Sequence, residues 1–82
     1  MKGLQAYLLI TTEPAKVWKV AESALKISGV KTAHAVTGSF DVIVFVETPK
    51  LDTLGEILNK VLLIDGVLHT QTAIVMPERL ST

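Results

Sequence analysis

Apolar residues alternate with polar ones, or run together, in four stretches of the chain that are rich in β-branched and aromatic side chains. Each stretch is bounded by turn residues or by residues that favour the start of a helix. This pattern predicts four strands. The predicted strands cover residues 4–12, 30–37, 40–47 and 67–76.

Two segments between these strands carry the three- and four-residue spacing of an amphipathic helix instead. In the first, apolar residues recur at Val17, Val20, Ala21 and Ala24, and Gly29 is the predicted terminating residue. In the second, the same spacing joins a set of leucines and a valine before Asp65 and Gly66. That set is Leu51, Leu54, Leu58, Val61 and Leu62.

Both predicted helices begin with a similar signal. Thr12 precedes Glu13 and Pro14, and Thr48 precedes Pro49. Threonine is a favoured N-cap residue, and proline is favoured in the first helical turn. The two threonines are therefore the predicted N-caps.

The resulting order of elements is βαββαβ. Two right-handed βαβ units joined through a hairpin predict a ferredoxin-like α+β fold, in which a four-stranded antiparallel sheet carries two helices on one face. With 82 residues the chain has room for one domain only, spanning residues 1–82.

The turn at Gly38 and Ser39 sets the register of the central hairpin. A two-residue loop there pairs His34 with Ile43, and paired residues share one face of a sheet. Phe40 and the small or β-branched side chains at positions 33, 35, 42, 44 and 46 then lie on one face, which is expected to pack against the helices. The face without helices is expected to carry a set of larger apolar side chains, namely Tyr7, Leu9, Val36, Ile43 and Phe45.

A patch of this kind exceeds what monomers usually expose. We therefore expect two sheets to pack face to face in a homodimer, as in dimeric α/β-barrels. The alternative is that the C-terminal tail folds across the sheet and shields part of it.

The composition of the chain argues against several classes of function. The chain is 49% hydrophobic and has a formal net charge of zero, and its lysines and arginine form no basic cluster, which argues against direct binding of nucleic acid. It has no cysteine, and His34 and His69 have no third ligand at a suitable spacing, so we expect neither a metal nor another cofactor. No apolar stretch reaches the roughly 20 residues of a membrane span. A cytoplasmic location is expected.

Three segments together resemble a known family. They read AYLLITTEP, ISGVKTAHAVTGSFDVIVFVET and IDGVLHTQTAIV, and they extend from about Ala6 to Met76. The most specific part is the run from Val36 through Asp41, supported by Thr70 and Thr72. In this order and spacing the segments are similar to the effector-binding domain of Lrp/AsnC transcriptional regulators, the RAM domain.

The resemblance implies dimers that pair through their sheets, higher assemblies or rings of dimers, and an amino-acid effector held between dimers. Regulators of this family usually carry an N-terminal helix-turn-helix domain, and no such segment precedes the first predicted strand. The chain thus looks like a stand-alone form that acts on full-length Lrp/AsnC regulators by co-assembly. Position 40 is commonly tyrosine in the family, and Phe40 lacks that hydroxyl.

The resembling residues have suitable chemistry for a free amino acid. Backbone N–H groups at Gly38 and Ser39 can bind a carboxylate, and Asp41 can accept a charge-assisted hydrogen bond from an ammonium group. Thr70 and Thr72 can donate or accept through their hydroxyls. The predicted ligand-binding set is completed by Phe40.

Structural roles remain open for the same residues. Asp41 can instead accept hydrogen bonds from nearby backbone amides, and Thr70 and Thr72 can be strand formers only. Trp18 lies beside the apolar stripe of the first predicted helix, where it marks either a subunit contact or helix packing.

Three functions fit the sequence. The preferred one is a regulatory module that binds an amino acid or a related small molecule. A small dimeric α/β-barrel enzyme is less favoured, because there is no cysteine and no paired-carboxylate motif within the apolar regions. The third is a structural module that only assembles.

Overall fold

The sheet has four strands in the spatial order β2-β3-β1-β4, and all neighbouring strands are antiparallel. This computed structural model describes residues 3–76 of the chain. The strands are β1 (Leu4–Thr12), β2 (Val30–Ala35), β3 (Val42–Thr48) and β4 (Val67–Ile74). The predicted ferredoxin-like architecture is confirmed.

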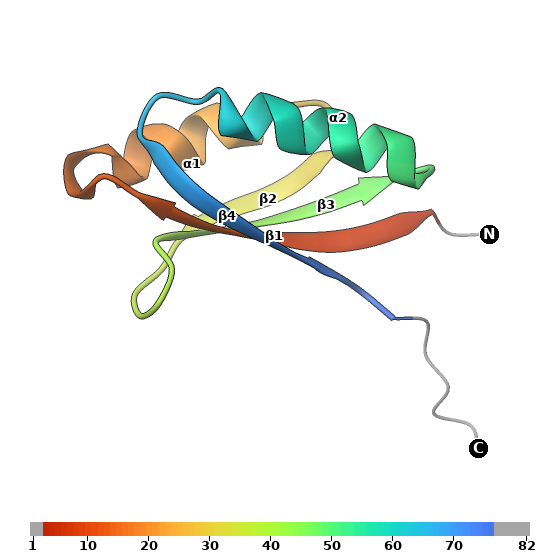
Figure 1. Cartoon of the computed structure of the whole chain (residues 1–82), viewed down its shortest axis with the longest axis horizontal. Coiled ribbons are helices and arrows are strands. Elements are labelled where there is room, and N and C mark those ends of the chain that lie inside the picture. The colour runs from red at the N-terminus through yellow and green to blue at the C-terminus, as the bar shows by residue number, and fades with distance from the viewer. Residues whose placement is uncertain (1–2, 77–82) are drawn as a thin grey trace, which may run out of the picture.

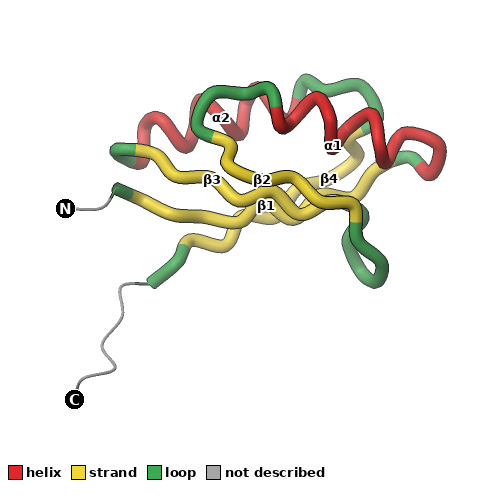
Figure 2. Tube along the Cα trace, turned by 180° about the vertical axis from the view of Figure 1, so that it is seen from behind, coloured by secondary structure: helices red, strands yellow, loops and turns green. Residues whose placement is uncertain are grey.

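Both helices lie on the same face of this sheet (Figure 1). Helix α1 (Val17–Leu25) follows a short 3-10 helix, η1 (Pro14–Lys16), and packs over β2 and β3, whereas α2 (Leu51–Leu62) packs over β3, β4 and β1. Seen from behind, the opposite face of the sheet has no helix over it (Figure 2).

The core fills the layer between the helices and the sheet. Alternate residues of β1 and β3 point into it, as the period of a strand requires. The helices contribute residues at three- and four-residue spacing. Its buried members are Ala6, Leu8, Ile10, Val20, Ala21, Ala24, Val42, Val44, Val46, Leu54, Ile57 and Val61.

The predicted register of the central hairpin is confirmed. His34 is opposite Ile43 and Ala35 is opposite Val42, so the two faces carry the predicted side chains. The connection is longer than a two-residue turn, because β2 ends at Ala35 and β3 begins at Val42. Only one backbone hydrogen bond continues the ladder into the loop, from Val36 N–H to Asp41 O, at 2.9 Å.

The predicted N-caps are wrong. Thr12 is the last residue of β1, and its hydroxyl donates to the carbonyl of Glu13 rather than accepting from the first helical turn. Glu13 occupies the N-cap position of η1, with Pro14 in the first turn as predicted. Likewise the hydroxyl of Thr48 donates to Lys50 O, and the N-cap of α2 is Lys50. Both threonines are buried at strand ends, where their hydroxyls satisfy a local carbonyl instead.

The last strand is shorter than predicted, since β4 ends at Ile74. A β-bulge interrupts its pairing with β1 between Thr11 and Thr12, which leaves Leu68 as the extra residue between His69 and Val67. The second half of β4 extends beyond the helices (Figure 1), and its side chains are exposed on both faces. The C-terminal tail that was considered as a shield for the open face lies outside the described residues.

The turn between α2 and β4 is tied to the start of α1. Lys16 and Lys19 donate to the carboxylate of Asp65, at 2.5 and 3.1 Å. The hydrogen bond with Lys16, together with the one from Lys19, lowers the pKa of Asp65, and the pKa of Lys16 is raised by the same pair. The ionised carboxylate of Asp65 therefore contributes to the free energy of unfolding above the ordinary pKa of aspartate, and this contribution is lost as the pH falls through the lowered pKa.

Two glycines are expected to respond in opposite ways to alanine. Gly66 has φ +104°, and an added Cβ would lie 2.6 Å from the Cβ of Lys16. Gly55 lies inside α2, and an added Cβ there would meet open space. We predict that Gly66→Ala destabilises the fold by about 2 kcal/mol or more, because a left-handed residue with a side chain costs roughly 1–2 kcal/mol before any clash. Gly55→Ala should stabilise it by about 0.5–1 kcal/mol.

Urea denaturation of both variants beside the parent chain measures this difference. If Gly66→Ala left the midpoint unchanged, the assigned backbone conformation at Gly66 would be wrong. Gly55→Ala serves as the matched control for the substitution itself.

Candidate functional site

Asp41 fastens the end of the central hairpin to the end of β1. Its backbone N–H donates to Ile10 O at 2.8 Å, and its carboxylate Oδ2 accepts a hydrogen bond from Thr12 N–H, also at 2.8 Å. Its carbonyl accepts from Val36 N–H. One residue thus links β1, the loop and the end of β2, which agrees with the structural role that the sequence left open for Asp41.

Only one oxygen of the Asp41 carboxylate takes part in this hydrogen bond. Within residues 3–76, Oδ1 of Asp41 has no hydrogen-bond partner, and the residue is half-buried. An anionic oxygen with a fixed orientation and partial access to solvent can accept a hydrogen bond from a cationic group. The structural and the ligand-binding roles are therefore compatible in the same side chain.

The tip of the hairpin offers backbone donors. Gly38 has φ +107°, a Cβ added there would meet nothing within 4 Å, and both Gly38 and Ser39 are exposed. In the described part of the chain, no acceptor is found for the N–H groups from Thr37 to Phe40. Successive N–H groups around a left-handed residue form a concave surface that suits an anion. Phe40, in the same loop, is half-buried.

The two threonines of β4 do not join this cluster within one subunit. Thr70 is opposite Ile10 and Thr72 is opposite Leu8, which places both on the helix-facing side of the sheet. They share a face, as expected, but β1 separates them from the hairpin. Since strands are about 4.8 Å apart, the separation across β1 is roughly 10 Å. A ligand that touches both groups has to do so in an assembly of subunits.

The helix-free face of the sheet carries an apolar surface at its centre. Tyr7 and Leu9 of β1 are opposite Phe45 and Ile43 of β3. The rings of Tyr7 and Phe45 pack in a tilted arrangement, with centroids 5.0 Å apart. Tyr7 is 42% exposed, and the other three residues are half-buried. We call these four residues the open-face patch.

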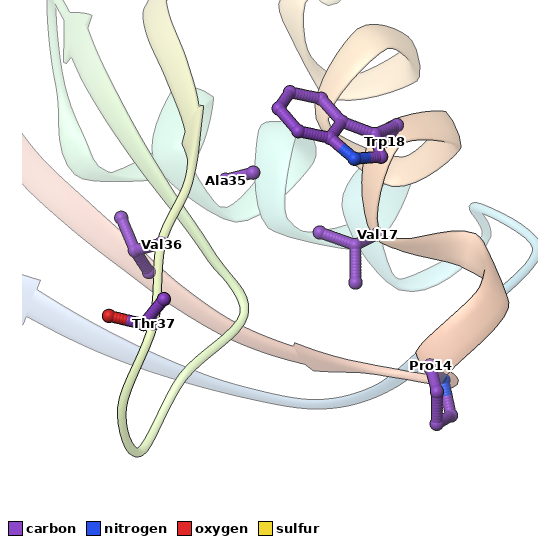
Figure 3. A pocket seen from close by; sticks show the side chains of 6 residues that line it. All are labelled: Pro14, Val17, Trp18, Ala35, Val36 and Thr37. Atoms are coloured by element: carbon purple, nitrogen blue, oxygen red, sulfur yellow. The ribbon is translucent and has the colours of Figure 1, made fainter.

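Val36 was expected on this face as well, and it lies just past the end of β2. There it lines a cavity of about 670 Å³ between the start of α1 and the hairpin. Figure 3 shows Pro14, Val17 and Trp18 on one wall and Ala35, Val36 and Thr37 on the other, with Val17 and Ala35 pointing toward one another. We call this hollow the Trp18 groove.

Trp18 itself is 72% exposed. Of the two roles considered for it, packing of α1 into the core is therefore wrong, because the ring contributes little to the buried layer. Its neighbours in the groove were missed from the sequence. The signal was a large side chain beside the core stripe of α1 opposite small residues of β2, Ala33 and Ala35, which cannot fill the space that a larger residue would occupy.

The two histidines lie far apart in the pairing scheme. His34 belongs to edge strand β2 and His69 to edge strand β4. Among residues 3–76, no group of three or more His, Cys, Asp or Glu side chains is placed to hold a metal ion. None of the helices in the same range has the length and apolarity needed to cross a membrane.

Comparisons with known proteins agree with this architecture. The family model described as the Lrp/AsnC ligand binding domain matches residues 5–82. An uncharacterised helix-turn-helix transcriptional regulator of Pyrococcus abyssi is 39% identical over 70 residues, which are 84% of this chain and 44% of that protein. The chain thus spans less than half the length of this relative.

Solved structures with the same fold include a hypothetical protein and a transcriptional regulator. A hypothetical protein from Pyrococcus horikoshii superposes with a TM-score of 0.82 at 34% identity, covering 93% of each chain. A transcriptional regulator from Neisseria meningitidis, solved as a complex with L-methionine, superposes with a TM-score of 0.79 at 25% identity. That match covers 94% of this chain and 52% of the regulator.

The link from Asp41 to Thr12 predicts a graded response to substitution. Asp41→Ala leaves the half-buried Thr12 N–H without its acceptor and should cost about 1–3 kcal/mol of unfolding free energy. Asp41→Asn keeps an acceptor oxygen and should cost less. Asp52→Ala, at an exposed position of α2, is the control for loss of a carboxylate.

Denaturation of the three variants, with hydrogen exchange of the Thr12 amide, checks the assignment. Faster exchange at Thr12 in Asp41→Ala alone is the expected result. Equal stability of Asp41→Ala and Asp52→Ala would contradict it.

Proposed function

The chain belongs to the family of Lrp/AsnC ligand-binding domains, and we propose that it binds a free amino acid or a closely related small molecule at a site shared between subunits. We propose in addition that it modulates full-length Lrp/AsnC regulators by assembling with them.

The observation that carries the first proposal is the hairpin end. Free backbone N–H groups around Gly38 lie within three residues of the carboxylate of Asp41, whose orientation is fixed by Thr12. An amino acid has a carboxylate that needs donors and an ammonium group that needs an anionic acceptor. The hairpin end supplies both kinds of group on one short loop.

A site between subunits follows from what one subunit lacks. The hairpin projects from the sheet on its helix-free side (Figure 2), so a ligand there has protein on one side only. Thr70 and Thr72, the remaining candidates, lie across β1. Ligand sites usually bury most of the ligand surface, and a second subunit would supply the missing walls.

Relatives support the ligand class. The regulator from Neisseria meningitidis, of which this chain resembles about half, was solved with L-methionine. The relatives that carry the matching domain within a longer chain include helix-turn-helix regulators. If their domains also pair through an open-face patch, this chain can replace one of the partners, which is the basis for co-assembly.

Isothermal titration calorimetry against a panel of amino acids tests the first proposal. We expect binding at micromolar to millimolar concentration, and a loss of about tenfold or more in Asp41→Asn, since a hydrogen bond to a charged group contributes roughly 1.5–3 kcal/mol. Asp41→Asn is informative because asparagine can still accept from Thr12 N–H, so the fold should be retained.

The same experiment separates the alternatives. No heat with any amino acid at millimolar concentration would leave a structural module that only assembles. Binding that is unaffected by Asp41→Asn would move the ammonium site elsewhere.

Sedimentation velocity tests the assembly. The open-face patch predicts a dimer or a larger species at micromolar concentration, and Phe45→Glu should shift the chain toward monomer because it places a charge in the contact. Leu63→Glu is the matched control, since Leu63 is 85% exposed and follows α2 on the other side of the sheet.

If the parent chain sediments as a monomer at micromolar concentration, the proposed site between subunits is wrong. Native mass spectrometry of the chain mixed with a full-length regulator of the family should show mixed species, and their absence under conditions where each protein self-assembles would refute co-assembly.

A further inference from the structure

Two hollows flank Trp18 along the side of the molecule where α1 lies over β2. The larger, the Trp18 groove, has a volume of about 670 Å³. The smaller, about 330 Å³, runs on toward Leu25 and Ala33. Both are lined by Trp18 and Ala35, so they adjoin at these two residues, and the smaller hollow is also lined by Glu22 and His34. Their sizes fall within or near the range of small-molecule sites, roughly 300–1,000 Å³.

The two hollows exist because a large side chain of α1 lies opposite small side chains of β2. Trp18 extends from α1 past the core, while the facing residues of β2 are alanines. β2 is an edge strand, so no further strand closes the space from outside. Trp18 is therefore 72% exposed, with the small side chains of Ala33 and Ala35 opposite it.

The walls of the Trp18 groove are held at a fixed separation. One wall follows directly from the end of β1 through Pro14, and the other is the end of β2 and the hairpin. The hydrogen bond from Thr12 N–H to Asp41, at 2.8 Å, links the end of β1, two residues before Pro14, to the loop that begins at Val36. The lining of the groove ends at Thr37, which directly precedes Gly38 of the proposed amino-acid site.

We propose that the Trp18 groove receives the side chain of the bound amino acid, which makes the effector an α-amino acid with a large apolar side chain. This inference rests on the proposed function, because it assumes that the charged end of an amino acid binds at the hairpin. It adds the class of side chain that the site selects.

The lining of the groove matches a ligand of this kind. Pro14, Val17, Trp18, Ala35 and Val36 are apolar, and the only polar side chain on the walls is that of Thr37. The hairpin, with its free backbone N–H groups and Asp41, begins where this lining ends. A ligand with one charged end and one apolar end fits both parts. A charged side chain in the groove would lose water without gaining a partner of opposite charge.

The chain offers a direct readout, because Trp18 is its only tryptophan. Its fluorescence reports on the surroundings of this one side chain, which lines both hollows. We expect L-leucine, L-methionine and L-phenylalanine to shift the emission to shorter wavelength and to bind about tenfold more tightly than L-alanine or L-aspartate. A factor of this size is what a few additional buried methylene groups provide.

Two variants test the position of the side chain. Ala35→Leu fills the groove and should weaken binding of L-leucine about tenfold while leaving L-alanine unchanged. Ala15→Leu makes the same change at an exposed residue of η1 that does not line the groove, and should have no effect. Trp18→Ala, monitored by calorimetry, is the second test; Trp18 is largely exposed, so its removal should leave the fold intact.

These experiments separate the binding of amino acids in general from the selection of apolar side chains by the Trp18 groove. If calorimetry shows no binding of any amino acid, the proposed function and the inference both fail. If amino acids bind without preference for apolar size, with unchanged emission and no effect of Ala35→Leu, the proposed function stands and the inference is overturned. If the emission shifts with protein concentration in the absence of amino acids and then ignores them, a second copy of the chain covers the groove, which also overturns the inference.

Discussion

The main constraint on this molecule is that two short helices can cover only one face of a four-stranded sheet. All of the buried apolar residues lie in the layer between the helices and the sheet, around β1 and β3. The described residues, 3–76, place no third layer on the other face. The face that is left carries Tyr7, Leu9, Ile43 and Phe45 rather than polar residues. Residues 3–76 thus leave an apolar surface without a helix over it, and the proposed self-association would cover that surface.

Asp41 connects this architecture with the proposed chemistry. Its main-chain groups end the pairing of β3 with β1 and close the hairpin, and its carboxylate holds Thr12. The same hydrogen bond orients the carboxylate before any ligand arrives, which reduces the cost of ordering it on binding. The closure of the hairpin and the proposed site therefore involve the same residue.

The sequence predicted what depends on local pattern. Alternation and the pairing of His34 with Ile43 fixed which residues of β2 and β3 face the helices, because the period of a strand leaves only two choices. The resemblance to Lrp/AsnC effector domains indicated the family, which the match over residues 5–82 confirms.

Contacts across the fold were harder to predict. Thr12 has a suitable side chain for an N-cap, but burial at the end of β1 turns its hydroxyl toward the carbonyl of Glu13. The separation of Thr70 and Thr72 from the hairpin depends on the strand order, with β1 between them. The Trp18 groove depends on which small residues of β2 face one large residue of α1, a tertiary contact with no periodic signal.

The two uncovered surfaces lie in different directions, and this has a consequence for regulation. The open-face patch points away from the helices, whereas the Trp18 groove opens between α1 and β2, on the side of the helices. Two subunits that pair through their open faces would leave both grooves outside the seam between their sheets. An amino acid whose side chain lies in the groove would then affect contacts made by the helix side and the hairpin, and not the sheet-to-sheet contact itself. By linkage, a ligand stabilises whichever assembly encloses it more completely. If subunits pair through their open faces as proposed, that assembly would be one between pairs, and the ligand would control the larger assembly while the pair persists without it.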